Sequence, residues 1–72
     1  MQQIRARILK YRPEEEHLIR RLGAAAVVLW NDLPGSVREM LLQQATNVFD
    51  REPTVQLRQQ LEILVENPPE IV

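Results

Sequence analysis

Five prolines divide the chain, and their spacing restricts the fold more than any other feature of the sequence. They stand at positions 13, 34, 53, 68 and 69. Proline is tolerated in the first turn of a helix, where its missing N–H would be unpaired anyway, but it breaks a helix interior. Each of the first three prolines is followed by apolar residues at helical spacing. The sequence therefore predicts three main helices, near residues 13–31, 36–50 and 54–66.

The first predicted helix changes character at Gly23. It opens with three glutamates, residues 14–16, where the helix dipole favours negative charge. One face then carries Leu18, Ile19, Leu22, Ala25 and Ala26. After Gly23, the segment 24–30 is apolar around its whole circumference, which is typical of a helix buried on every side. We expect Gly23 to relieve crowding in a close helix contact.

The second predicted helix begins with helix-capping chemistry. Ser36 and Glu39 have the spacing of a capping box, in which each side chain bonds the other residue's backbone N–H, and Asp32 is a competing cap. Its apolar residues span an arc of about 200°, wider than the roughly 100° stripe that one packing partner requires. They are Met40, Leu41, Leu42, Ala45, Val48 and Phe49. One edge of this arc can face the chain's own core and the other a second surface.

The third predicted helix has a narrower apolar stripe, and Thr54 is its candidate N-cap. The stripe consists of Leu57, Leu61, Leu64 and Val65. The two prolines at 68 and 69 end the helix, and residues 67–72 should be a frayed tail. Residues 1–12 form a basic N-terminal arm. Its segment 4–11, IRARILKY, fits both a short helix and an alternating strand, and we favour the helix.

The expected fold is all-α, a small bundle of three main helices in one domain with a short basic N-terminal element. The connection 31–36 is too short for anything but a direct turn, so the first two main helices should pack as neighbours. The predicted core consists of Leu18, Leu22, Leu29, Leu41, Val48, Leu61 and Leu64.

Composition excludes several classes of protein. Cysteine is absent, so neither disulfides nor thiolate metal sites are available. The longest apolar run, residues 22–30, is far shorter than the roughly 20 residues of a membrane-spanning helix. No secretory signal segment follows the basic start, so we expect a cytoplasmic protein.

The side chains that carry catalysis are few: one His, one Lys, one Ser and one Tyr. Glu14 and His17 share one helix face in an E-x-x-H pattern, as in carboxylate-bridged di-metal bundles. The pair lies in an exposed first turn, so we expect a surface His and no metal site. Ser36 has no base beside it, and no Gly-rich phosphate loop is present. The sequence predicts no enzymatic activity and no cofactor.

The formal net charge of −1 conceals a basic start and an acidic end. If IRARILKY is a strand, the order strand, helix, Gly-Ser turn, helix resembles the ribbon-helix-helix repressors and antitoxins, whose paired strand enters the DNA major groove. The longer first helix and the further helical segment after residue 50 depart from that pattern. A helix-turn-helix with Arg38, Gln43 and Asn47 reading bases is also conceivable, although the acidic C-terminal half attracts phosphate little. DNA binding is therefore the alternative function, and its contacts would be Arg5, Arg7, Lys10 and Arg12.

Non-catalytic protein–protein interaction is the expected function. A chain of this length buries only about 60% of its unfolded surface, and two helices have more apolar surface than the others can cover. We expect a homodimer or a partner-binding module, such as a small regulatory adaptor or an antitoxin-like protein. The predicted interface consists of Trp30, Met40, Leu42 and Phe49.

Overall fold

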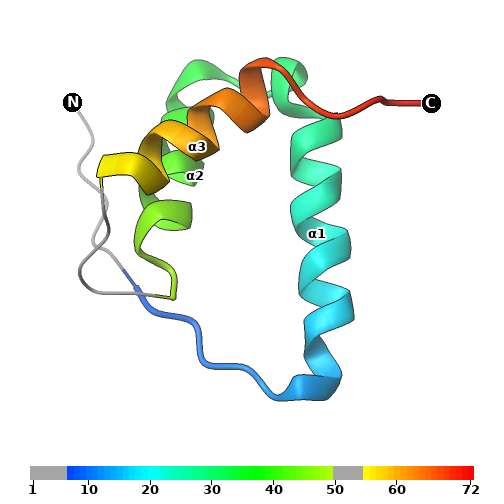
Figure 1. The fold of residues 1–72 in the computed structure, drawn as a ribbon, viewed down its shortest axis with the longest axis vertical. Helices are drawn as coiled ribbons and strands as arrows, with labels where there is room; N and C mark the ends of the chain where they lie inside the picture. The colour runs from blue at the N-terminus through cyan, green and yellow to red at the C-terminus, as the bar shows by residue number, and fades with distance from the viewer. Residues whose placement is uncertain (1–6, 50–54) are drawn as a thin grey trace.

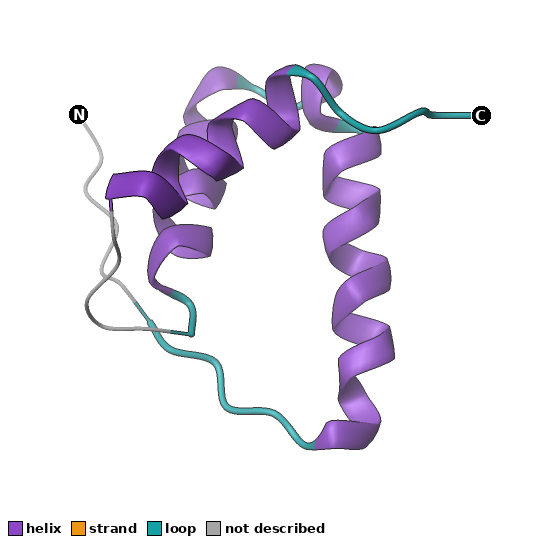
Figure 2. Cartoon of the chain, in the orientation of Figure 1, coloured by secondary structure: helices purple, strands orange, loops and turns teal. Residues whose placement is uncertain are grey.

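The computed structural model describes residues 7–49 and 55–72, and Figure 1 shows its fold. Regular structure among these residues is helical throughout (Figure 2), so the predicted all-α class is confirmed. In chain order the elements are the 3-10 helix η1 (Pro13–Glu15), α1 (Glu16–Val28), the 3-10 helix η2 (Trp30–Asp32), α2 (Gly35–Asn47) and α3 (Val55–Glu66).

The helix predicted at residues 13–31 is an α-helix flanked by a 3-10 turn on each side. Pro13 begins the first turn, as predicted. The backbone N–H of Arg12 donates to Oε1 of Glu15 at 3.0 Å, and the N–H of Glu15 donates to the carbonyl of Arg12 at 2.8 Å. These two bonds fix the point at which the extended chain enters the helix.

The predicted capping box at the start of α2 is wrong. Pro34 is the N-cap, no side chain caps the helix, and Ser36 is already its second residue. Asp32, the competing cap, lies in η2. Because the helix begins at Gly35, Glu39 is its fifth residue and lies too far along to cap it. Its carboxylate instead accepts charge-assisted hydrogen bonds from Arg58 of α3.

α3 begins at Val55, and its predicted cap Thr54 lies outside the described residues. At the other end, the N–H of Asn67 donates to the carbonyl of Ile63 at 2.8 Å, and the helix stops before the two prolines. Residues 67–72 are exposed and have no regular secondary structure.

The favoured helix at residues 4–11 is wrong for residues 7–11, which form neither helix nor strand, and residues 4–6 lie outside the described part. Tertiary contacts hold this segment against the end of α2. The N–H of Leu9 donates to the carbonyl of Val48 at 2.8 Å, and the ring centroids of Tyr11 and Phe49 are 5.7 Å apart. An extended residue advances about 3.3 Å against 1.5 Å in a helix, so only extended chain crosses from α2 to Pro13 in so few residues.

α2 packs along α3, whereas α1 stands apart from both (Figure 1). The prediction that the first two main helices pack as neighbours is therefore wrong. Leu33 and Pro34 are both extended, with ψ of 141° and 148°, and they direct α2 away from α1. A tighter turn would have folded the two helices against each other.

The predicted core is also largely wrong, because its members on α1 are exposed. Leu18, Leu22 and Leu29 are 54%, 74% and 51% exposed. Leu41 and Leu64 are exposed as well, and Val48 and Leu61 are half-buried. Of the described residues, Trp30 is the one buried apolar side chain, 8% exposed.

The molecule is open for its size. It exposes 6389 Å², whereas a compact monomer of 8.4 kDa exposes about 4,600 Å². Its radius of gyration is 12.6 Å, compared with about 11 Å for a compact domain of 72 residues. The difference in area, about 1,800 Å², is summed over the whole chain, including its N-terminal segment and its exposed tail at residues 67–72.

Candidate interaction surface

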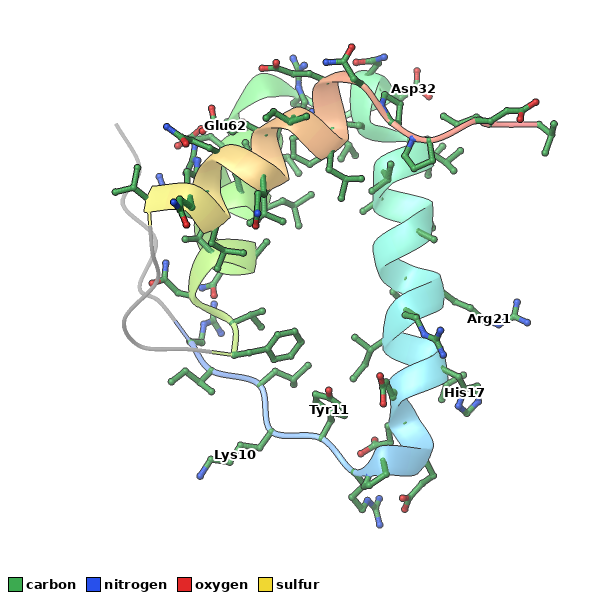
Figure 3. The ribbon with its side chains drawn as sticks, in the orientation of Figure 1. Lys10, Tyr11, His17, Arg21, Asp32 and Glu62 are labelled. Carbon is green, nitrogen blue, oxygen red and sulfur yellow. The ribbon has the colours of Figure 1, made fainter. Side chains whose placement is uncertain are left out.

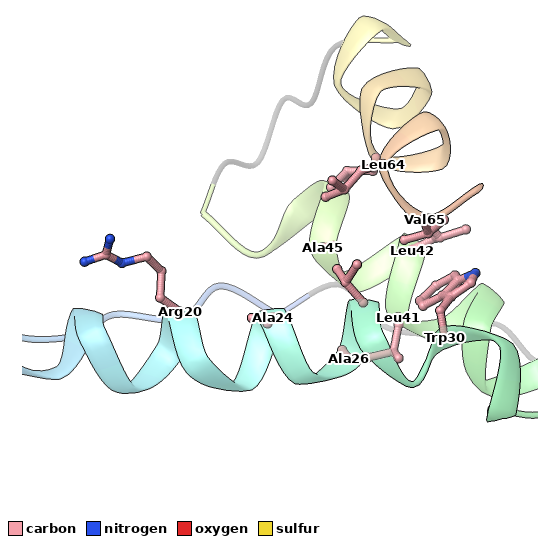
Figure 4. A pocket seen from close by; sticks show the side chains of 12 residues that line it. Arg20, Ala24, Ala26, Trp30, Leu41, Leu42, Ala45, Leu64 and Val65 are labelled. Carbon is pink, nitrogen blue, oxygen red and sulfur yellow. The ribbon is translucent and has the colours of Figure 1, made fainter. Parts of the chain in front are cut away.

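An apolar groove of about 480 Å³ lies between α1 and the α2–α3 pair. Figure 4 shows α1 along one side of it, with Leu64 and Val65 of α3 across from it. Arg20, at the end of the groove away from Trp30, is the one charged residue among the described residues that line it. The full lining is Arg20, Gly23, Ala24, Ala26, Val27, Trp30, Leu41, Leu42, Ala45, Leu61, Leu64 and Val65. Apart from Arg20, the lining of this groove is apolar.

The wall that α1 contributes consists mostly of small residues. A Cβ built on Gly23 would meet nothing within 4 Å, so Gly23 does not relieve a crowded contact inside this chain, contrary to expectation. It faces open space in the groove instead. Small side chains on an unpacked helix face allow another backbone to approach closely.

The opposite face of α1 carries a second apolar surface, which we name the leucine seam. It consists of Leu18, Leu22, Ala25 and Leu29, and all four residues are exposed. Successive residues of an α-helix are about 100° apart, which places the seam on nearly the other side of α1 from Gly23 and Val27. Leu18, Leu22 and Leu29 were predicted to be core residues because the sequence shows their common face but not what covers that face.

The structure divides the predicted interface residues among different environments. Trp30 is buried within the chain, so it is not part of an exposed surface, and it lines the groove together with Leu42. Met40 and Leu42 are half-buried. Phe49 is 60% exposed and contacts Tyr11, away from the groove. The four residues therefore do not form one patch, and the sequence missed the leucine seam.

Polar contacts on the outer side of the α2–α3 pair connect the two helices. A guanidinium nitrogen of Arg58 lies 3.1 Å from both carboxylate oxygens of Glu39, and Nε of Arg58 is 3.3 Å from Oε1 of Glu62. Gln43 donates a further bond to Glu39 at 3.3 Å. The hydrogen bonds from Arg58 and Gln43, together with the charge of Arg58, hold the pKa of Glu39 below its ordinary value.

The basic residues of the N-terminal arm are exposed but partly engaged. Arg5 lies outside the described residues. Nε of Arg12 lies 3.7 Å and 3.6 Å from carboxylate oxygens of Glu14 and Glu15, which offsets its charge. The backbone N–H of Arg7 donates to Oε1 of Gln44, and Lys10 points away from the helices (Figure 3). Residues 7–12 contain no strand, so the described part of the N-terminal arm does not form the strand that ribbon-helix-helix binding requires.

Two of the three residues considered for base reading on α2 have internal partners. Asn47 donates to the carbonyl of Gln43 at 2.7 Å, and Gln43 donates to Glu39. Arg38 is half-buried. A helix that reads bases presents free polar side chains to the groove of the duplex. The side chains of Gln43 and Asn47 are already in use, whereas Nε of Arg38 is buried without a hydrogen-bond partner.

His17 is exposed on α1 and, like Arg21, points away from α2 and α3 (Figure 3). Within the described ranges, no group of three His, Cys, Asp or Glu side chains is placed to hold a metal ion. Nor is any helix in those ranges long and apolar enough to cross a membrane.

The chain matches no protein-family model, no curated protein and no solved structure with which it was compared. The function must therefore be inferred from the chain's own surfaces.

Proposed function

We propose that this chain is a non-catalytic protein–protein interaction module whose native packing is completed by association, of the kind found in small regulatory adaptors and antitoxins. The supporting observation is the burial pattern, in which Trp30 is the one buried apolar side chain among the described residues. Monomers rarely expose contiguous apolar patches larger than a few hundred Å². Here the groove and the leucine seam together present apolar surface on two sides of α1.

Association also fits the size of the chain. A standard interface removes about 800 Å² from each partner, and obligate dimers remove more. Association is the means by which a chain this short compensates for a small core.

The test measures mass and stability together. Sedimentation equilibrium from 1 to 200 µM gives the mass, and thermal unfolding at the two ends of this range gives the dependence of Tm on concentration. Association with itself predicts a dimeric mass and a Tm that rises with concentration, because only the folded chain binds. If the module requires a different partner, we expect a monomeric mass and a broad, weakly cooperative thermal unfolding transition.

A monomer that unfolds cooperatively at the same Tm throughout this range, with slow amide hydrogen exchange in α1, would overturn the proposal. Slow exchange would mean that the helix is already protected without a partner.

A further inference from the structure

Residues 7–12, which we name the strap, connect the C-terminal end of α2 in space to the start of η1 (Figure 1). The N–H of Leu9 donates to the carbonyl of Val48, the C-cap residue of α2, at 2.8 Å. This carbonyl is one of those that a helix end leaves without a partner inside the helix. The N–H of Arg7 donates to Oε1 of Gln44 at 3.2 Å. Backbone N–H groups two residues apart point to the same side of extended chain, so both bonds attach the strap to α2.

The side chain of Tyr11 continues this attachment. Its ring and that of Phe49 are inclined at 59° with centroids 5.7 Å apart, an arrangement that aromatic pairs favour. Lys10, between Leu9 and Tyr11, points away from the helices (Figure 3). The contacts with α2 therefore come from alternate residues of the strap, at positions 7, 9 and 11.

The strap is joined directly to the helix that follows it. Arg12 and Glu15 exchange two hydrogen bonds, so the last residue of the strap is fixed to the first helical turn. Pro13 is the fourth residue after Leu9, and extended chain advances at most about 3.6 Å per residue. Pro13 therefore stays within about 14 Å of Leu9, and the attachment of Leu9 to α2 limits where α1 can begin.

The other end of α1 has an anchor of its own. Trp30, just after α1, is buried and lines the groove together with residues of all three α-helices. Between this anchor and the strap, α1 contributes mostly small residues to the groove, and Gly23 and Ala24 are exposed. Small side chains bury little apolar area, so the wall that they form holds α1 only weakly to α2 and α3.

We propose that the strap acts as a clasp: its attachment to α2 holds α1 in place as one wall of the groove, and its release lets α1 swing outward about Leu33 and Pro34. The attachment is exposed, since Leu9, Tyr11 and Phe49 are 46%, 40% and 60% exposed. A segment with few buried contacts opens at a lower free energy than a packed one. The strap can therefore detach while α2 and α3 remain paired.

Release of the strap removes one wall of the groove. A partner that binds in the groove favours the attached state and shifts the equilibrium toward it. The strap thereby regulates the groove. This consequence for binding rests on the proposed interaction function, whereas the position of α1 in the free chain depends on no partner.

Pulsed EPR on the full chain measures the position of α1 directly. The native chain has no cysteine, so spin labels go only to introduced ones, His17→Cys on α1 and Ile63→Cys on α3, both at exposed sites. About 24 Å of helix separates residue 17 from Leu33, so a swing of about 10° moves the label by about 4 Å. Labelled chain is diluted in unlabelled chain, so that only distances within one chain are measured.

Proline substitutions test the backbone attachment. Leu9→Pro removes the N–H that donates to Val48 and remains compatible with extended chain. We expect it to broaden the distance distribution and to lengthen the mean by about 4 Å or more. Ile8→Pro is the matched control, because it places a proline in the same strap where no hydrogen bond of the described chain is lost. It should keep the wild-type distribution.

Substitutions of Tyr11 test the ring contact. Tyr11→Ala removes the ring that lies against Phe49 and should lengthen the distance in the same way. Tyr11→Phe keeps the ring and should keep the wild-type distribution. Helicity at 222 nm and Trp30 emission are measured for each variant, and a longer distance in either Leu9→Pro or Tyr11→Ala with helicity retained supports the clasp.

A wild-type distance distribution in both Leu9→Pro and Tyr11→Ala would overturn the clasp. A broadened distribution with lost helicity would overturn it as well, because the strap would then keep α1 folded rather than in place. Either result leaves the interaction function standing, since no partner takes part in the measurement. Conversely, a chain that fails the test of the interaction function should still show the longer distances when the strap is released.

Discussion

Trp30 lines the same groove as residues of α1, α2 and α3, and it is the most buried apolar side chain of the described residues. Replacing a buried Trp by Ala costs about 3–5 kcal/mol, through lost burial and the cavity left behind. We therefore expect Trp30→Ala to lower the free energy of unfolding by about 3 kcal/mol or more in urea titrations followed by circular dichroism. Ile71→Ala, in the exposed C-terminal segment, serves as the control and should have little effect.

If Trp30→Ala leaves the free energy of unfolding unchanged, burial of Trp30 does not contribute to the stability of the fold. Trp30 emission should also follow folding rather than the dimer contact, because the side chain is buried inside the chain. We therefore expect the Trp30 fluorescence emission to shift to the red on dilution only if dissociation of the dimer also unfolds the chain.

The structural role of a single residue was predictable from the sequence where neighbouring residues determine it. It was not predictable where the residue contacts a part of the chain distant in sequence. Pro13 begins a helical turn as its fixed φ requires. Glu39 does not cap because α2 begins before Ser36, and its carboxylate pairs instead with Arg58, 19 residues further along. An apolar residue such as Trp30 can be buried inside its own chain or in an interface with another chain. The sequence alone could not distinguish these two environments.

At the scale of elements, the contact between α2 and α3 depends on pH through Glu39. Its pKa is lowered in the folded chain, chiefly by the hydrogen bond from Arg58. The stabilisation is therefore fully present above the ordinary glutamate pKa of 4.5 and is lost as the pH falls through the lower, folded value. The effect should be modest and weaker in salt, because the pair is exposed.

Thermal unfolding between pH 6 and pH 3 measures this contribution. Glu39→Gln should lower the Tm at pH 6 and flatten its fall on acidification, whereas Glu70→Gln, in the exposed C-terminal segment, should keep the wild-type profile. Equal profiles for wild type and Glu39→Gln would show that the pair does not contribute to stability.

The three main helices were predictable as elements because proline spacing and apolar periodicity are properties of each segment alone. Their arrangement was not. The extended Leu33 and Pro34 turn α2 away from α1, and no local pattern distinguishes that turn from one that folds the helices together. Residues 7–11 are extended because of their bonds to α2, which helical periodicity in IRARILKY does not reveal.

At the scale of the whole molecule, we expect only weak, non-specific binding to DNA. Four basic groups give a slope of at most about −3.6 in log K against log salt. The ion pairs of Arg12 with Glu14 and Glu15 should reduce that slope further. Fluorescence anisotropy with labelled duplexes of two unrelated sequences, from 50 to 200 mM salt, measures it. Sub-micromolar, sequence-selective binding at 150 mM salt, lost in Arg7→Ala, would instead favour the DNA-binding alternative.

The bond between Arg7 and Gln44 joins residues 37 positions apart, whereas the contact of α2 with Arg58 spans half that distance along the chain. Closing a longer loop costs more conformational entropy, and contacts distant in sequence form late in folding. The order of events during folding should follow from this difference. The α2–α3 hairpin is expected to form first, and the N-terminal segment is expected to attach last. On a ribosome, α1 with its leucine seam emerges before α2 and α3, so a nascent chain would hold the seam complete before the contact between those two helices can form.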